Sequence, residues 1–460
     1  MVQWIFKILE LLLRFLRAER EHWARSPGAI RFLDLIFGRF PANCFMLLPE
    51  RPEISNPLAR QITHDYQRFK SGLPKQLEDY VLENYAIDLA SEYGGIKIKN
   101  PFGKASGQLS LALHQVQKDA QAGLGFVVLK TVIAQNREGV QSMQQWAIPE
   151  TRMKVEQIRG ASGRVGWTVT WKGRGWFQSF AAYLDFFGKA LEAASAARML
   201  VIPSCKFHLP GPDETRWRVD EYQFTTQALL EVWRAQQERD SAMPLEKDFS
   251  PTLAGSSLAT QKTKIREWLT VVPRLIRQGA GAHSLRIGLK IFNAMFDDQF
   301  QLEMLNIAGC PGPDRADFLV YANRLFDPHK SFAGKTGVAC GGPDLSERNL
   351  RVLQVWRRGP RSAEIASLPV SATGDISSGK MAVEYLMQGC SSFQMHTFFQ
   401  LPDSEYVMTG GHKTERALHR LYFHPDDGFV PWICHLQQML KWKERMNIGQ
   451  MAEWFAREGR

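Results

Sequence analysis

The sequence has few cysteines, and they are isolated from one another. Its 460 residues include only six, and no two of them form a CxxC pair. Zinc, iron–sulfur and dithiol redox sites usually need such pairs, so these sites are disfavoured. Isolated thiols predict a reducing, cytoplasmic setting. The six are Cys44, Cys205, Cys310, Cys340, Cys390 and Cys434.

Long apolar segments are missing as well. The chain has no apolar run of about 18 residues and no signal peptide with a small-residue cleavage site. Secretion and a membrane-spanning helix are therefore disfavoured. Zinc-finger spacing and the aromatic signature of RNA-binding domains are also missing, so we expect no nucleic-acid partner despite the net charge of +10. This basicity equally suits an anionic cofactor or acidic lipid.

The amino-terminal region predicts helices. Residues 2–17 repeat apolar side chains at helical spacing with basic residues interleaved. Two interpretations stay open: this helix packs on the body of the protein, or residues 1–40 lie on the inner face of a membrane as a peripheral contact. Another helical segment follows near residues 59–90, so residues 1–92 are predicted to form a helical amino-terminal extension.

From residue 93 onward, apolar strand candidates alternate with amphipathic helix candidates. This pattern predicts the α/β class and a TIM (β/α)8 barrel over residues 93–460. Residues 136–176 are predicted to form a long loop over one barrel mouth. The predicted strands are 126–129, 199–203, 245–249, 285–291, 318–321, 370–372 and 392–395, and the predicted helices include 221–238, 260–278 and 299–307.

Three segments join a short apolar strand to small or polar residues at its carboxyl end, where such barrels place their ligands. They are 100–107, 123–131 and 368–397. Small residues after the first strand would let a ligand approach the backbone closely. Lys130 and Lys290 end apolar strands, where a buried ammonium needs compensation from an electron-rich ligand or from a salt bridge.

Several of these segments resemble the dihydroorotate dehydrogenases and the FMN barrel of dihydropyrimidine dehydrogenases. The resemblance runs from about Tyr93 to the end of the chain. It implies an FMN-dependent oxidoreductase that moves hydride between flavin N5 and a CH–CH pair. The segments are Ile96–Gly107, Leu129–Gly139, Leu289–Asp297, Asp317–Asn323 and Met446–Ala456. The implied cofactor-binding residues are Ala105, Ser106, Gly107, Lys130, Thr131, Lys290, Asn323, Gly341, Gly342, Gly374, His396 and Thr397.

The phosphate end departs from the family pattern. Gly374-Asp375 stands where the family usually has paired glycines, and His396 replaces the glycine before Thr397. A carboxylate repels a phosphate unless it points away, whereas His396 can donate a hydrogen bond to it.

The substrate side departs further. The fourth-strand loop, Asn-x-Ser-Cys/Ser-Pro-Asn in the family, reads Asp248-Phe249-Ser250-Pro251-Thr252 here. Ser250 is the hydroxyl candidate for the base, with Lys130 as a second catalytic candidate. A substrate other than dihydroorotate is expected, and an anionic one would suit the arginines near the mouth. The predicted substrate-binding residues are Asp248, Thr252, Arg164 and Arg324.

Three functions are compatible with the sequence. The first is a flavin-dependent dehydrogenase with a small-molecule substrate, working as a homo-oligomer or as a subunit of a redox complex. The second is a catalytically degenerate barrel that acts as a binding or assembly subunit, which the missing base motif and Asp375 favour. The third is a membrane-associated dehydrogenase that uses quinone, which depends on residues 1–40 alone.

Overall fold

The computed structural model describes most of the chain after residue 45. The described residues are 46–149, 152–172, 175–211, 213–237, 241–249, 262–293, 297–312, 314–359, 365, 367–441 and 445–458. The chain divides into compact units at residues 1–47 and 48–460, and the predicted helix at 2–17 lies outside the described residues. Among the residues described, no helix combines the length and hydropathy needed to cross a membrane.

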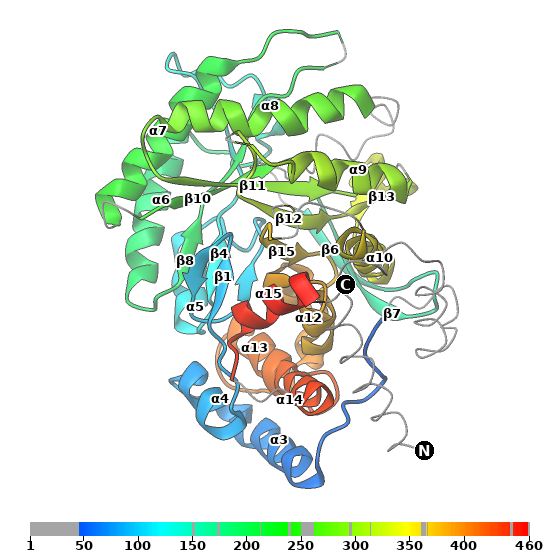
Figure 1. The fold of residues 1–460 in the computed structure, drawn as a ribbon. Coiled ribbons are helices and arrows are strands. Elements are labelled where there is room, and N and C mark those ends of the chain that lie inside the picture. The colour runs from blue at the N-terminus through cyan, green and yellow to red at the C-terminus, as the bar shows by residue number, and fades with distance from the viewer. Residues whose placement is uncertain are drawn as a thin grey trace, which may run out of the picture. The chain divides into compact units, whose positions relative to one another are not determined.

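A parallel sheet closed into a barrel forms the centre of the second unit (Figure 1). The sheet has ten strands, but two pairs of them are single strands interrupted by a short break, so the barrel has eight positions. β16 (Cys390–Met395) pairs with β3 (Phe102–Lys104) and closes the ring. The predicted TIM (β/α)8 barrel is confirmed. The other strands are β4 (Phe126–Val128) with β5 (Val132–Ile133), β8 (Leu200–Ile202) with β9 (Ser204–Lys206), β10 (Met243–Asp248), β11 (Leu285–Phe292), β12 (Phe318–Asn323) and β15 (Val370–Thr373).

Helices surround these strands (Figure 1). Each predicted strand overlaps an observed one, because apolar runs at these positions are buried on both faces. Asp297 shows how a helix start is fixed, since its carboxylate accepts a hydrogen bond from the Phe300 N–H over 2.9 Å. The helices are α5 (Leu113–Gln121), α6 (Phe180–Ser195), α7 (Val219–Gln236), α8 (Lys262–Ala280), α9 (Asp298–Ala308), α10 (Pro343–Arg358) and α12 (Gly379–Leu386).

The amino-terminal end of the barrel is filled by protein. The antiparallel pair β1 (Ser91–Tyr93) and β2 (Ile96–Ile98) belongs to the same buried cluster as Phe126 and Phe318. Gly288 leaves room for the aromatic ring of Phe318, since a Cβ at Gly288 would lie 2.1 Å from Phe318 Cζ. The open end for a ligand is therefore the carboxyl end of the strands.

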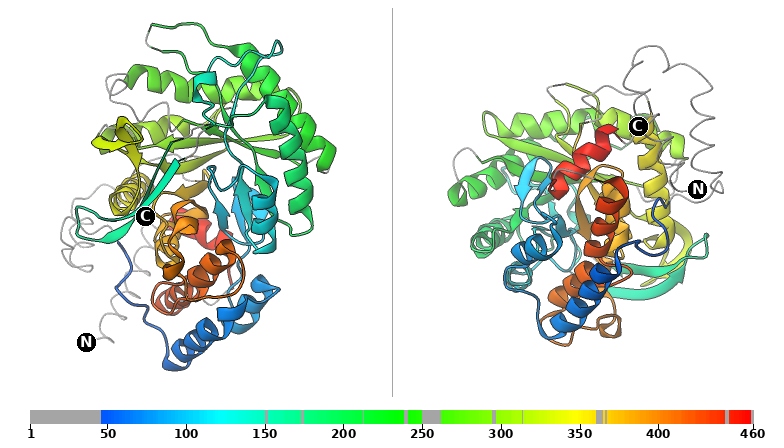
Figure 2. Two further views of the ribbon diagram at one scale, coloured as in Figure 1. Left: turned by 180° about the vertical axis from the view of Figure 1, so that it is seen from behind. Right: turned by 60° about the horizontal axis from the view of Figure 1, so that its bottom comes forward.

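Two helices precede the barrel and pack beside helices from the end of the chain (Figure 2). α3 (Asn56–Arg68) and α4 (Leu77–Tyr85) contact α14 (Phe429–Leu440), and α3 also contacts α13 (Lys413–Phe423). The predicted closing helix is present as α15 (Ile448–Glu458). The domain boundary at residue 92 stays a prediction.

The predicted long loop over the mouth is wrong in its conformation, because it contains an antiparallel hairpin. β6 (Arg152–Arg159) pairs with β7 (Val165–Lys172), and both views in Figure 2 place the hairpin beside α10. A second hairpin, β13 (Leu325–Phe332) with β14 (Lys335–Cys340), enlarges the connection after β12. Both hairpins lie at the carboxyl end, where they shape the site.

Candidate functional site

A cavity opens at the carboxyl ends of β3, β11, β12, β15 and β16, partly covered by β7. Its free volume is about 70 Å³, which holds a few water molecules, so a three-ring ligand can enter only if the walls move. The sequence-predicted residues on its walls are Ala105, Ser106, Lys290, Asn323, Arg324, Gly341, Gly342, Gly374, His396 and Thr397.

Other predicted site residues are placed differently. Gly107, Lys130, Thr131, Asp248 and Arg164 are described but are not among the residues that line the cavity. The predicted base Ser250 and the predicted substrate residue Thr252 lie outside the described residues, so their roles stay predictions.

The cavity has two ends of different character. We call the lysine end the part formed by Ala105, Ser106, Lys290, Arg324 and His396. We call the aspartate end the part formed by Gly341, Gly342, Gly374, Asp375 and Ser377.

Hydroxyl groups connect three neighbouring strands at the lysine end. Ser106 Oγ lies 2.9 Å from Thr131 Oγ1, which lies 3.0 Å from Ser204 Oγ. Thr131 Oγ1 also donates toward Asp248 Oδ2 over 3.5 Å, which is long for a hydrogen bond. These contacts bring together three residues that were predicted from separate motifs, namely Ser106, Thr131 and Asp248.

Lys130 is a buried cation in the break between β4 and β5. Its side chain is 6% exposed, and among the described residues no acceptor lies within hydrogen-bonding distance of its ammonium. Burial, together with the neighbouring cations Arg324 and Lys290, lowers the pKa of Lys130 to about 7, although Asp248 opposes the shift. Holding a cation here costs free energy unless a ligand compensates it.

Lys290 lines the cavity and is partly compensated by a residue that the sequence motifs did not single out. Its Nζ lies 3.7 Å from Glu246 Oε2 on the neighbouring strand. The Glu246 Oε1 atom accepts short hydrogen bonds from Tyr93 Oη and Gln394 Nε2. The salt-bridged interpretation of Lys290 therefore holds in part. The available signal for Glu246 was a carboxylate two residues before Asp248, a spacing that places both side chains on the same face of β10.

His396 fills the space that Gly107 leaves. A Cβ at Gly107 would lie 2.5 Å from His396 Cδ2 and Nε2, so glycine is required where the imidazole packs. Burial, and then Arg324 and Lys130, lower the pKa of His396 to about 3. The imidazole is therefore neutral at neutral pH.

The aspartate end is dominated by the carboxylate of Asp375. This residue has a φ of +50°, a conformation that favours glycine, and its side chain is 4% exposed. Its Oδ2 accepts a hydrogen bond from Ser346 Oγ over 2.8 Å. Burial raises the pKa of Asp375 to about 6, even though Arg164 and Ser346 oppose the shift.

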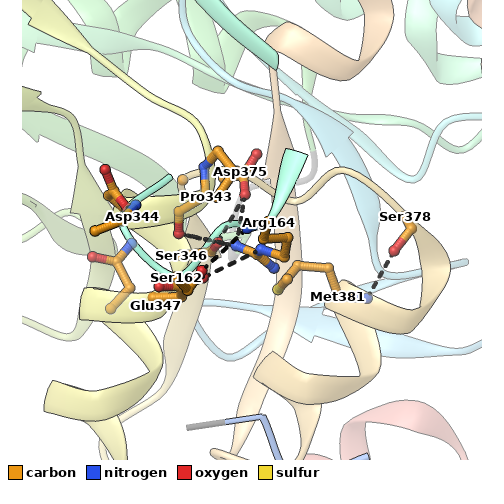
Figure 3. A network of polar contacts seen from close by, with 12 residues as sticks. Ser162, Arg164, Pro343, Asp344, Ser346, Glu347, Asp375, Ser378 and Met381 are labelled. Carbon is orange, nitrogen blue, oxygen red and sulfur yellow. Dashed lines mark hydrogen bonds and ion pairs between the residues drawn. The ribbon is translucent and has the colours of Figure 1, made fainter. Parts of the chain in front are cut away.

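Arg164 reaches this carboxylate from the turn between β6 and β7 (Figure 3). Its Nη2 lies 3.2 Å from Asp375 Oδ2 and donates to the Pro343 carbonyl over 2.9 Å and to Ser346 Oγ. Its Nε lies 3.4 Å from Glu347 Oε1. Arg164 was predicted to bind substrate, but the structure places it against α10 and Asp375.

The same turn is fixed to the start of α10 by two further hydrogen bonds, of which Figure 3 labels the partners Ser162 and Glu347. The Ala161 N–H donates to Asp344 Oδ1 over 2.7 Å, and Ser162 Oγ donates to Glu347 Oε1 over 2.5 Å. Asp344 and Glu347 lie near the amino-terminal end of α10, where the positive end of the helix dipole stabilises negative charge. No motif identified them, because their partners lie more than 180 residues away in the chain.

The two ends fit different parts of the predicted FMN. Small residues and buried cations at the lysine end suit an electron-rich ring, although the ring needs the walls to move. A phosphate does not fit the aspartate end, because the Asp375 carboxylate lines the cavity there and Glu347 and Asp344 add negative charge close by.

Comparison with solved structures gives the same fold. The chain resembles the crystal structure of the DHODH from Eimeria tenella in complex with ferulenol, with a TM-score of 0.50 and 14% sequence identity. The likeness covers 88% of this chain and 96% of that one, so it extends over the barrel as a whole. No protein-family model matches the sequence, and no curated protein matches it. At this identity the likeness establishes the fold.

Proposed function

We propose that this chain is a flavin-dependent oxidoreductase that moves hydride between a flavin and a CH–CH pair of an anionic small molecule. The observation that carries the proposal is Lys130, a buried cation with no partner within hydrogen-bonding distance among the described residues. Lys130 does not line the cavity itself, but its charge interacts with Arg324 and Lys290 on the cavity wall. Perturbed buried cations close to a cavity are typical of functional sites. An electron-rich ring would supply the missing compensation.

The lysine end would hold the ring through several residues. A bound flavin would supply the hydride acceptor. Ala105 and Ser106 have small side chains, so the backbone after β3 can contact a planar group closely. Lys290 places its ammonium on the wall, held in direction by Glu246. His396 would have to move from its position over Gly107 to admit the ring.

Proton transfer and substrate binding are assigned to neighbouring residues. With a pKa of about 7, Lys130 Nζ can give or take a proton at neutral pH, and Ser250 remains the predicted base. Arg324 on the cavity wall contributes the cation that would attract an anionic substrate. Asp248 Oδ2 lies 3.5 Å from Thr131 Oγ1, so its carboxylate would help to orient the hydroxyl groups of Ser106, Thr131 and Ser204.

The remaining predictions concern the setting of the protein. A homo-oligomer or redox-complex subunit, peripheral membrane contact through residues 1–40 and a cytoplasmic location stay predictions. FMN is the cofactor that the sequence resemblance implies, and the proposal requires only the flavin ring.

The proposal is tested by the visible absorption spectrum of the purified full chain, with and without added FMN or riboflavin. A flavin spectrum is expected, and acid release identifies the compound. Lys290→Met should weaken flavin binding about tenfold or more, because the ammonium on the wall is lost. Lys247→Met is the matched control, since Lys247 is equally buried on β10 but donates to the Phe207 and Asp248 carbonyls.

A second candidate is a degenerate barrel that acts as a binding or assembly subunit. The small free volume of the cavity and the carboxylate of Asp375 favour it. A folded chain that takes up neither flavin would establish this candidate over the first.

A further inference from the structure

We propose that this cavity selects a flavin without a phosphate, of the riboflavin type, over FMN. This inference rests on the proposed function and adds the identity of the cofactor's tail. It follows from the aspartate end, whose charges and hydrogen bonds oppose a phosphate and suit a chain of hydroxyl groups.

The charge balance at this end is negative. Asp375 lines the cavity, Glu347 and Asp344 place two more carboxylates close to it, and the Arg164 guanidinium contacts Asp375 and Glu347. A phosphate monoester carries a charge of about −1.5 to −2 at neutral pH. Placing it here adds like charge in a partly desolvated site, where such repulsion is strong.

Lys380 on α12 does not correct this balance. Its ammonium donates to the Pro49 carbonyl over 2.5 Å and to the Glu50 carbonyl over 3.4 Å. It also lies 4.8 Å from the centre of the Trp432 ring. These contacts already occupy the ammonium, and Lys380 is not among the residues that line the cavity.

Donors that would suit a phosphate already have acceptors in the protein. The Arg164 guanidinium is shared among Asp375, Ser346 and the Pro343 carbonyl (Figure 3). The Gly341 N–H, on the cavity wall, donates to Thr168 Oγ1 over 2.9 Å. A phosphate would have to break these hydrogen bonds, and leaving a buried group without its partner costs free energy.

A hydroxylated tail has the opposite character. Its hydroxyl groups can donate hydrogen bonds to the Asp375 carboxylate. Such bonds are strong because the acceptor is charged. Asp375 and Ser377 both face the cavity, so they offer an acceptor and a donor to such a tail. The tail also leaves the Arg164 bonds intact.

The test measures the dissociation constants of riboflavin and FMN for the full chain, by quenching of flavin fluorescence at pH 7.5. Riboflavin should bind about tenfold more tightly than FMN, or more, which corresponds to the cost of one like-charge contact. Asp375→Gly suits the positive φ and frees Arg164, so it should reverse the preference, while Asp375→Asn should reduce it.

Asp317→Asn is the control, since Asp317 pairs with Arg277 at the other end of β12 and should leave the preference unchanged. Equal or tighter binding of FMN by the natural chain would overturn this inference and leave the proposed function standing. An unchanged preference in both folded Asp375 variants would overturn it as well. Binding of neither flavin would overturn the proposed function together with the inference.

Discussion

The lysine end and the aspartate end of the cavity have opposite electrostatic characters. The lysine end contains Lys290 and Arg324, and Lys130 lies close to both; these three cations outnumber the neighbouring carboxylates of Glu246 and Asp248. At the aspartate end, Arg164 contacts the carboxylates of Asp375 and Glu347, and Asp344 adds a third negative charge close to Asp375. The two ends therefore attract different parts of a ligand.

The difference follows from how each end is built. Lys290 lies within β11 and Lys130 in the break between β4 and β5, so the barrel itself positions the cations. Arg164, in contrast, comes from a hairpin turn, and Asp375 from the connection after β15. Loops and hairpins vary more readily than barrel strands. A barrel of this kind can thus keep its ring-binding strands while the recognition of the cofactor's tail changes.

The largest expected effect concerns Lys130. Its pKa in the folded chain is about 7, below the usual 10.5, so the unfolded chain binds more protons between these values. The free energy of unfolding should therefore rise as the pH increases from about 7 to 10.5. Below pH 7 the folded chain bears the full cost of burying the charged Lys130 ammonium. Lys130→Met should raise the free energy of unfolding at pH 6 by about 3 kcal/mol, measured by urea denaturation without flavin.

Lys247→Met serves as the comparison for this prediction. The pKa of Lys247 is also lowered to about 7 by burial, but its ammonium has two carbonyl acceptors. The Lys247→Met variant should therefore gain less stability than the Lys130→Met variant. Equal gains would show that Lys130 is not the uncompensated cation of the two.

A smaller effect is expected at Asp375, with the opposite pH dependence. Its pKa in the folded chain is about 6, above the usual 3.8, so the folded chain binds more protons between these values. Stability should therefore fall as the pH rises from about 4 to 6. Above pH 6, Asp375→Asn should gain about 1 to 3 kcal/mol relative to the natural chain, measured by denaturation from pH 4 to 8. A relative loss would mean that the ion pair with Arg164 outweighs burial.

The smallest effect is expected where the two hairpins meet. Lys330 Nζ donates to Glu156 Oε2 over 2.7 Å, at a partly exposed position. Glu156→Gln should lower the free energy of unfolding by less than about 1 kcal/mol, and less still in high salt. The FMN-to-riboflavin binding ratio should stay the same. A changed ratio would mean that hairpin position, rather than the charge of Asp375, sets the preference.

The barrel could be predicted because its strands are short apolar runs separated by amphipathic helices. Residues 318–321, for example, were predicted as a strand from their apolar character, and β12 extends two residues further. The polar residues at strand ends came together because parallel strands share one carboxyl edge. Small residues and lysines at that edge were therefore visible in the sequence.

The hairpin β6–β7 was missed because glycine and arginine in residues 136–176 indicated a loop. Val165, Trp167 and Val169 alternate with small or polar residues, which is the pattern of a strand. The pattern does not give the buried face, because Val165 is exposed whereas Gly166 and Thr168 are buried. The pair of Arg164 with Asp375 had no local signal at all. Only the folded barrel brings these residues together.

The distance along the chain between Arg164 and Asp375 has a consequence for synthesis. The two residues are 211 positions apart, and at the usual rates of translation Asp375 is made about 10 to 40 s later. A hairpin forms within microseconds of emerging from the ribosome. The β6–β7 turn must therefore wait for its partners with Arg164 in solvent, and the mouth of the barrel is completed late in biogenesis.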